Sequence, residues 1–322
     1  MIFRFRGAIE WRWIPIISVA ILPGIAVSVL TGNLVWLLAS FFAVCSIIPY
    51  VSSHGLKWFT LLNGLLICGV AYILHFMLLE HWYYFLISIT ILAIFMGFLD
   101  NAHKELRSLS CWIIIACVYG AVKLGDSSIT ELTLLVMTFL TAAGVVMALM
   151  LPLKNKIEMV NIKFIPMNHE LFLFNFKYML PTLVSIIVCH YLKLSEPEWV
   201  IWSSLSVVYP ELDAVLLKLR RRVMAGAMGV CGGLVIGLVL PHSVLVSYFC
   251  FIMVCLSLQI FRDYFLAYLL RSGCVVIYAV NQGSMQIAFD RVLNIVVGGM
   301  IGLVSTYALI YLYRRAFYSR KA

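Results

Sequence analysis

Residues 218–240 read KLRRRVMAGAMGVCGGLVIGLVL, and this stretch decides the class of fold. Four of its first five residues are cations, and the 18 residues that follow carry no charge. A helix needs roughly 20 apolar residues to cross the hydrocarbon core of a bilayer. The stretch therefore predicts a membrane-spanning helix that begins beside a basic segment.

The rest of the chain repeats this pattern. Of 322 residues, 64% are hydrophobic and 11% are charged, and the mean hydropathy is +1.04. Soluble domains carry about 25% charged residues, so this composition excludes a soluble fold. The apolar runs are long and continuous, whereas strands of a membrane β-barrel alternate over about ten residues. We expect an all-α, polytopic transmembrane helix bundle.

The apolar runs predict about twelve spans at roughly 20 residues each. Two of them, 109–122 and 197–209, are short for a bilayer and are expected to be tilted, broken or re-entrant. The predicted spans are 13–31, 34–51, 57–79, 82–99, 109–122, 131–153, 173–192, 197–209, 219–240, 243–261, 264–281 and 291–313.

In the topology that these spans predict, most basic residues lie on one side of the membrane. Lys and Arg are enriched in cytoplasmic loops of membrane proteins. With twelve spans, both termini lie on the cytoplasmic side, together with 19 of the 23 Lys and Arg residues. The opposite loops hold Lys123, Lys193 and Arg291, and Arg271 falls inside a span. The net charge of +9 is therefore attributed to topology and contact with anionic membrane lipids, and binding of nucleic acid is not expected.

An internal repeat is predicted at an offset of about 160 residues. Residues 1–153 form a first six-helix membrane repeat, 154–172 a cytoplasmic linker and 173–322 a second six-helix repeat. An even number of spans makes the two repeats parallel. Each half has a proline-containing helix, then a tryptophan-bearing span ending in proline, then a glycine-containing span, as marked by Pro15, Trp36, Pro49 and Gly64 and by Pro181, Trp199, Pro210 and Gly226.

The second half resembles the fusaric acid resistance protein-like (FUSC) membrane family, which includes aromatic acid exporters. The resemblance rests on the span from Trp199 to Tyr209, the corner Pro210-Glu211-Leu212, and the basic run that leads into Arg222-Val-Met-Ala-Gly-Ala-Met-Gly229. The last span repeats this theme from Arg291 to Gly299. The sequence departs from the family pattern at Ala225 and Gly226, where Gly-Thr is usual, and at Asn294, where an acid or glycine is common. The first half, residues 1–153, resembles the family weakly.

This resemblance implies a multi-pass protein of the bacterial inner membrane that exports small organic anions, aromatic or amphipathic in character. A passive anion channel and a non-transporting membrane subunit that organises partner proteins are the alternatives. The expected partners are the organic anion, membrane lipids, a periplasmic adaptor protein and further copies of the chain. The sequence lacks phosphate-binding loops, nucleophile elbows and metal-ligand spacing, so no enzyme activity, cofactor or metal is expected.

Arg271 is the main candidate for substrate binding. A charged side chain inside a span is rare unless it is paired or faces a cavity. Its guanidinium group could receive a carboxylate of the substrate, pair with Asp263, or extend toward the cytoplasmic surface. Three aromatic residues are further substrate-binding candidates, and they could instead belong to the interfacial aromatic belt: Trp199, Trp202 and Tyr209. Asn281 and Gln282 are the last candidates, and this pair could form an exit gate or an external loop.

Proton coupling is assigned to Asp100 and His103, which are three residues apart and share a helix face if the helix continues. A solvated corner is the alternative for this pair. Close helix packing is expected at small residues, because side chains of this size let helix backbones approach within a membrane. These positions are Gly226, Gly229, Gly233, Gly298 and Gly302.

Overall fold

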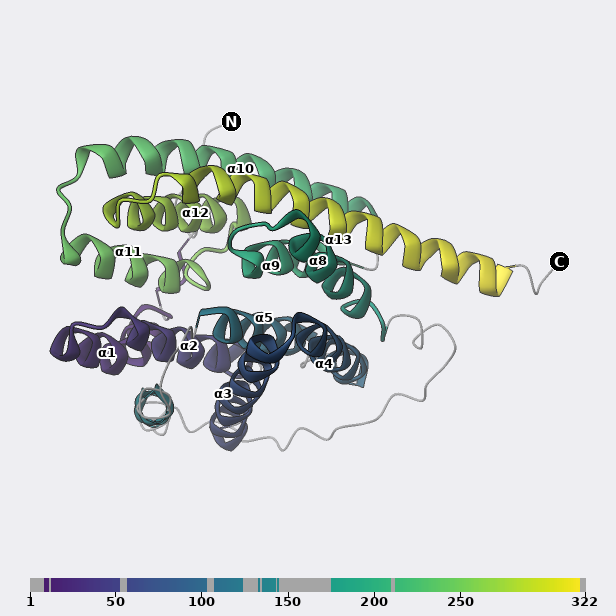
Figure 1. Ribbon diagram of the computed structural model, residues 1–322, viewed down its shortest axis with the longest axis horizontal. Coiled ribbons are helices and arrows are strands. Elements are labelled where there is room, and N and C mark those ends of the chain that lie inside the picture. Colours follow the sequence, from purple (N-terminus) through teal and green to yellow (C-terminus); the bar gives the residue numbers. More distant parts are fainter. Residues whose placement is uncertain are drawn as a thin grey trace. The chain divides into compact units, whose positions relative to one another are not determined.

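The computed structural model describes residues 9–11, 13–52, 57–102, 107–123, 133, 135–142, 144, 175–209 and 212–318. Within these residues the fold is all-helical, apart from one isolated bridge between Ile9 and Phe261 (Figure 1). The helices are α1 (Trp13–Thr31), a 3-10 turn η1 (Leu34–Trp36), α2 (Leu37–Ser52), α3 (Lys57–Glu80), α4 (Trp82–Ala102), α5 (Arg107–Lys123), α8 (Met179–Leu192), α9 (Pro197–Val207), α10 (Leu212–Val239), α11 (Val244–Ser257), α12 (Tyr264–Asn281) and α13 (Gln286–Tyr318).

Most predicted spans coincide with one of these helices, and the ends differ for physical reasons. Helix α10 begins at Leu212, before the predicted start at residue 219, so the basic run 218–222 is helical. Lys and Arg are good helix formers and can extend their charged ends to the membrane surface, so a basic run need not end a helix. The predicted linker 154–172 lies outside the described residues.

Four described helices are long and apolar enough to cross a membrane: α1, α10, α12 and residues 286–312 of α13. Six shorter apolar helices accompany them within the described residues. At 1.5 Å per residue, the 33 residues of α13 measure about 50 Å, which exceeds the hydrocarbon core of about 30 Å. The chain is thus a multi-pass helical membrane protein.

The chain forms two compact units, and it passes between them within α3, α10 and α13. Unit 1 comprises residues 1–68, 126–157 and 221–292, and unit 2 comprises 69–125, 158–220 and 293–322. In unit 1, α11 packs against α12, and α1 packs against α2 and α11 (Figure 1). In unit 2, α4 packs against α5 and α8, and α9 packs against α8 and α5.

Capping residues set several helix ends. The side chain of Ser243 accepts a hydrogen bond from the Leu245 amide at the start of α11, and Asp263 accepts one from the Phe265 amide at the start of α12. Pro197 occupies the first turn of α9, where a missing amide hydrogen costs nothing. Helix α8 ends at Leu192, and the next residue, Lys193, adopts a left-handed conformation with φ of 50°.

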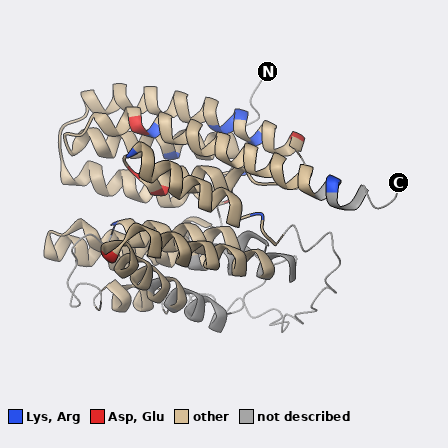
Figure 2. Cartoon of the chain, turned by 45° about the vertical axis from the view of Figure 1, so that its right-hand side comes forward, with Lys and Arg blue, Asp and Glu red and all other residues tan. Residues whose placement is uncertain are grey.

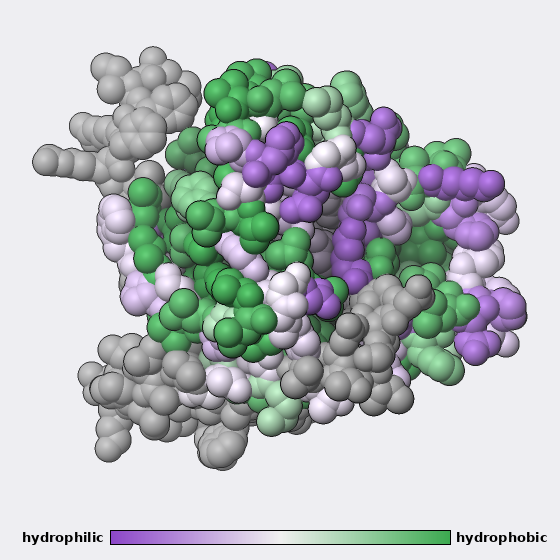
Figure 3. Space-filling model, turned by 60° about the vertical axis from the view of Figure 1, so that its left-hand side comes forward, coloured by the Kyte–Doolittle hydropathy of each residue, from purple (hydrophilic) through white to green (hydrophobic). Residues whose placement is uncertain are grey.

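The outside of the described helices is apolar. Large hydrophobic side chains such as Leu30, Phe95, Val239 and Leu245 are exposed. Charged residues are few along the described helices (Figure 2), and hydrophobic side chains spread over much of the described surface that Figure 3 shows. Lipid chains are as apolar as these side chains, so such a surface is stable in a membrane.

Candidate anion-binding site

Three side chains of α12 define one face of this helix in unit 1. Tyr264, Tyr268 and Arg271 are spaced four and three residues apart, which places them on successive turns of the same face. Tyr268 and Arg271 are buried. The two tyrosine rings stack, with centroids 5.9 Å apart and ring planes 17° from parallel.

Arg271 binds the last residue of α11. Its Nε donates to the Ser257 hydroxyl over 3.1 Å, and its Nη2 donates to the Ser257 carbonyl over 3.0 Å. These two bonds fix the plane of the guanidinium group. Asp263, the alternative partner considered from the sequence, instead caps the start of α12 through the Phe265 amide at 2.7 Å.

A second buried arginine reaches the same face from α10. The guanidinium carbon of Arg222 lies 4.3 Å from the centroid of the Tyr268 ring, and its Nη1 donates to the Tyr264 hydroxyl over 2.8 Å. Stacking of a guanidinium group on an aromatic ring stabilises the cation, more so away from water. Arg222 and the two tyrosines therefore form one unit of contact between α10 and α12.

The charges of Arg222 and Arg271 act on each other. Two like charges in an apolar surrounding raise the energy of both, and an anion placed near them lowers it. The hydroxyl groups of Tyr268 and Ser272 are also buried and have no hydrogen-bond partner in the described part of the chain. This face of α12 thus combines cations, aromatic surface and hydroxyl donors, which is the chemistry that recognises an aromatic carboxylate.

Asn281 and Gln282 join α12 to the start of α11. The Asn281 side chain donates to the Ser243 carbonyl and the Ser247 hydroxyl and accepts from the Ser243 amide. Gln282 also donates to the Ser247 hydroxyl, over 3.0 Å. In this structure, both predicted substrate-binding side chains hold two helices together.

The predicted aromatic candidates lie in unit 2. Trp199 and Trp202 are buried in α9, and the Trp202 ring meets Trp112 of α5 edge to face, with centroids 6.2 Å apart. Tyr209 is exposed beyond the end of α9, and the Lys218 ammonium lies 4.6 Å from its ring centroid. The side chains of Asp100 and His103 lie outside the described residues, as do Pro210 and Glu211.

Four of the five glycines chosen from the sequence lie at close helix contacts. A Cβ at Gly229 would stand 2.4 Å from the Leu269 carbonyl oxygen, and one at Gly233 would stand 2.5 Å from that of Gly273, where α10 meets α12. Between α13 and α9, a Cβ at Gly298 would stand 2.3 Å from the Val200 carbonyl oxygen, and one at Gly302 would stand 2.4 Å from that of Ser204. Gly226 is buried in α10.

Sequence reasoning missed the part that Arg222, Tyr264 and Tyr268 play around Arg271. The sequence indicates Arg222 as one of several basic residues and as the first residue of the family motif, and neither pattern places it beside Tyr268. The spacing of Tyr264 and Tyr268 before Arg271 was an available signal, because it indicates one helix face. The pairing of that face with Arg222 spans 42 residues of sequence and needed the tertiary structure.

The sequence model of the fusaric acid resistance protein-like family matches residues 184–305, which is less than half of the chain. A search of curated proteins and a search of solved structures returned no match. The matched segment begins in α8 and ends in α13, so it includes Arg222, Arg271 and their tyrosine neighbours. The resemblance seen in the sequence is confirmed over this segment, because residues 184–305 of this multi-pass membrane protein match the model of the fusaric acid resistance protein-like family.

Proposed function

We propose that the protein is a secondary transporter that exports small organic anions, aromatic or amphipathic in character, across the bacterial inner membrane. The observation that supports this proposal is the arrangement of Arg222 and Arg271 around the stacked rings of Tyr264 and Tyr268. The membership of residues 184–305 in a resistance-protein family is consistent with export.

In this proposal Arg271 receives the carboxylate of the substrate. Its bonds to Ser257 fix the plane of the guanidinium group, and the planar fork of an arginine matches the geometry of a carboxylate. The rings of Tyr264 and Tyr268 offer flat apolar surface to the aromatic part of the substrate. Asn281, Gln282, Trp199, Trp202 and Tyr209 are the additional candidates from the sequence, and Asp100 with His103 stays the sequence-based candidate for proton coupling.

Flux measurements with proteoliposomes test the role of Arg271. Radiolabelled benzoate serves as the probe, and an imposed pH gradient drives its movement. We expect Arg271→Ala to reduce the flux about tenfold or more, because a charge-assisted bidentate contact is lost. The matched control is Arg221→Ala, which removes an exposed cation one residue from Arg222 and leaves the flux unchanged.

Loss of packing must be separated from loss of binding, because Arg271 also holds α11. Ser257→Ala removes the hydroxyl that accepts from Arg271 and keeps the cation. It is expected to lower the unfolding temperature and to retain benzoate flux. Wild-type flux in Arg271→Ala would assign this arginine to the scaffold. Unitary currents in planar bilayers would favour the channel alternative.

A further inference from the structure

A second charged cluster lies in unit 2 and contains none of the residues of the α12 face. Lys123, at the end of α5, forms ion pairs with two carboxylates, those of Glu196 and Glu198. Its ammonium lies 3.1 Å from Oε1 of Glu198. The Glu196 carboxylate also acts on that of Glu198 as a neighbouring like charge. The Lys123 ammonium is therefore shared by two carboxylates.

The three side chains differ in their access to solvent. The Glu198 side chain is 1% exposed, whereas Glu196 is 19% and Lys123 is 34% exposed. Both carboxylate oxygens of Glu198 are buried, and the cation beside them is Lys123. A buried carboxylate that shares one cation with a second carboxylate is a favourable place for a proton. Glu196 and Lys123 connect this place to the outside.

The titratable groups near Glu198 come from α5, α8 and the loop before α9, and α13 contributes the uncharged side chain of Asn294, which binds the same loop. Helix α5 supplies Lys123, and Tyr119 of the same helix acts on the Lys123 charge. Helix α8 supplies Cys189, and the loop between α8 and α9 supplies Glu196. With Lys123 charged and both carboxylates ionised, the ion-pair group carries one net negative charge.

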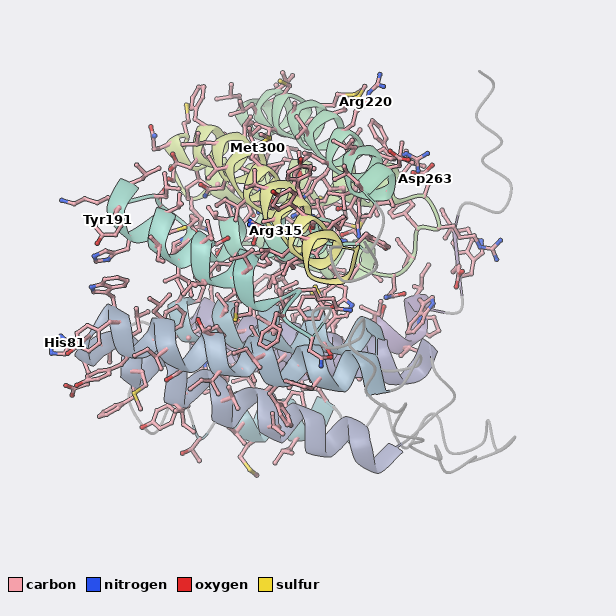
Figure 4. The ribbon with its side chains drawn as sticks, turned by 90° about the vertical axis from the view of Figure 1, so that its right-hand side faces the viewer. His81, Tyr191, Arg220, Asp263, Met300 and Arg315 are labelled. Carbon is pink, nitrogen blue, oxygen red and sulfur yellow. The ribbon has the colours of Figure 1, made fainter. Side chains whose placement is uncertain are left out.

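The loop that carries Glu196 is held from several sides. Asn294 of α13 donates to the carbonyls of Ser195 and Glu196 over 2.8 and 3.3 Å. Trp82 at the start of α4 stacks on His190 near the end of α8, with centroids 3.9 Å apart. Figure 4 shows the neighbours of this stack, His81 and Tyr191, at the same edge of unit 2. The acidic pair is thus built into a defined position.

We propose that Glu198, paired with Glu196 and Lys123, is the proton-binding site that couples a pH gradient to transport. The proton comes from water, passes the partly exposed Glu196, and adds to a carboxylate oxygen of Glu198. The resulting carboxyl group is neutral, so its ion pair with Lys123 is lost. This loss weakens the link between α5 and α9. Release of the proton to water restores the ion pair. In the topology predicted from the sequence, Lys123 faces the non-cytoplasmic side, where protons enter during export.

This inference rests on the proposed transport function, so its test separates coupling from transport. The variant is Glu198→Gln, which imitates the protonated state. In proteoliposomes with benzoate, we expect it to lose accumulation driven by a pH gradient and to retain exchange of labelled for unlabelled benzoate within about a factor of two of wild type. Glu80→Gln, which removes an exposed carboxylate at the end of α3, is the matched control and is expected to keep both activities. Full gradient-driven accumulation in Glu198→Gln would overturn the proposal.

Proton binding itself is measured without substrate. Infrared difference spectra of the membrane-embedded protein between low and high pH are expected to show a carboxyl C=O band that is absent in Glu198→Gln and present in Glu80→Gln. Lys123→Met is expected to move the midpoint of this band to higher pH, because a neighbouring cation favours the ionised carboxylate. A band that Glu198→Gln leaves unchanged, or a midpoint unmoved by Lys123→Met, would refute the site. If no benzoate moves in any sample, the transport function fails while these spectra still decide the proton site.

Discussion

Single polar residues in this protein join helices, as Asn281 shows. Its amide makes three hydrogen bonds to Ser243 and Ser247, so one side chain ties the end of α12 to the start of α11. Interhelical hydrogen bonds of membrane proteins contribute about 0.6 to 2 kcal/mol each, so such a contact matters when the solvent is lipid. The same residue is a sequence-based candidate for substrate binding, and stability measurements can separate the two roles.

We expect Asn281→Ala to lower the free energy of unfolding by about 1–3 kcal/mol, because three partly buried hydrogen bonds between α12 and α11 are lost. Thermal unfolding followed by circular dichroism in detergent measures this change. Gln286→Ala serves as the control, since Gln286 is exposed and its amide binds Asp290. An unchanged unfolding temperature together with reduced benzoate flux would favour the substrate-binding role.

At the scale of helices, small residues determine how closely α10 approaches α12. Three glycines of α10 are spaced four residues apart, Gly229, Gly233 and Gly237. A Cβ added at any of them would contact α12. Gly232 lies on the same helix, and a Cβ there would meet nothing within 4 Å. The helix thus contains its own matched control for close packing.

Gly229→Ala is expected to destabilise the protein by about 1–3 kcal/mol, because the added methyl group would stand 2.4 Å from the Leu269 carbonyl oxygen and force the helices apart. Gly232→Ala is expected to be neutral or to stabilise the helix by up to about 1 kcal/mol, since alanine loses less backbone entropy than glycine. Thermal unfolding of both variants in the same detergent tests this contrast. Equal unfolding temperatures would contradict the close contact between α10 and α12.

At the scale of the whole molecule, the position of the termini follows from the number of spans. The alternation of basic residues predicts both ends in the cytoplasm. Fusions of alkaline phosphatase and of green fluorescent protein to each end test this prediction, because the first is active outside the cytoplasm and the second inside it. We expect fluorescence and no phosphatase activity at both ends. Ends on opposite sides would exclude an even number of spans and, with it, the parallel repeat.

Helix positions were largely predictable from the sequence. Runs without charge must be helical in a membrane, because every backbone polar group needs a partner where no water is present. Such runs predicted α1, α4 and α12 within a few residues of their ends. The number of membrane crossings was less predictable, since a short apolar helix such as α11 has the composition of a span without its length.

The residues of the two charged clusters could be noticed singly in the sequence but not assembled. Arg271 stands out because a cation interrupts an apolar run, whereas Arg222 lies in a basic run and Glu198 lies at the start of the predicted span 197–209. Lys123 and Glu196 are 73 residues apart, and no local pattern predicts their contact. Local periodicity reports on one helix at a time.

Composition and charge alternation by themselves determined that this is a helical membrane protein. Transfer of apolar side chains from water to lipid is favourable, and transfer of a cation into lipid is costly. The close contact made by the glycines of α10 was also predictable from the sequence, since small residues let the backbones of two helices approach each other. Tertiary structure alone decided that Arg222 stacks on Tyr268 and that Lys123 lies between two carboxylates. Helices that are uniformly apolar have many possible partners, and the packing of particular side chains selects one of them.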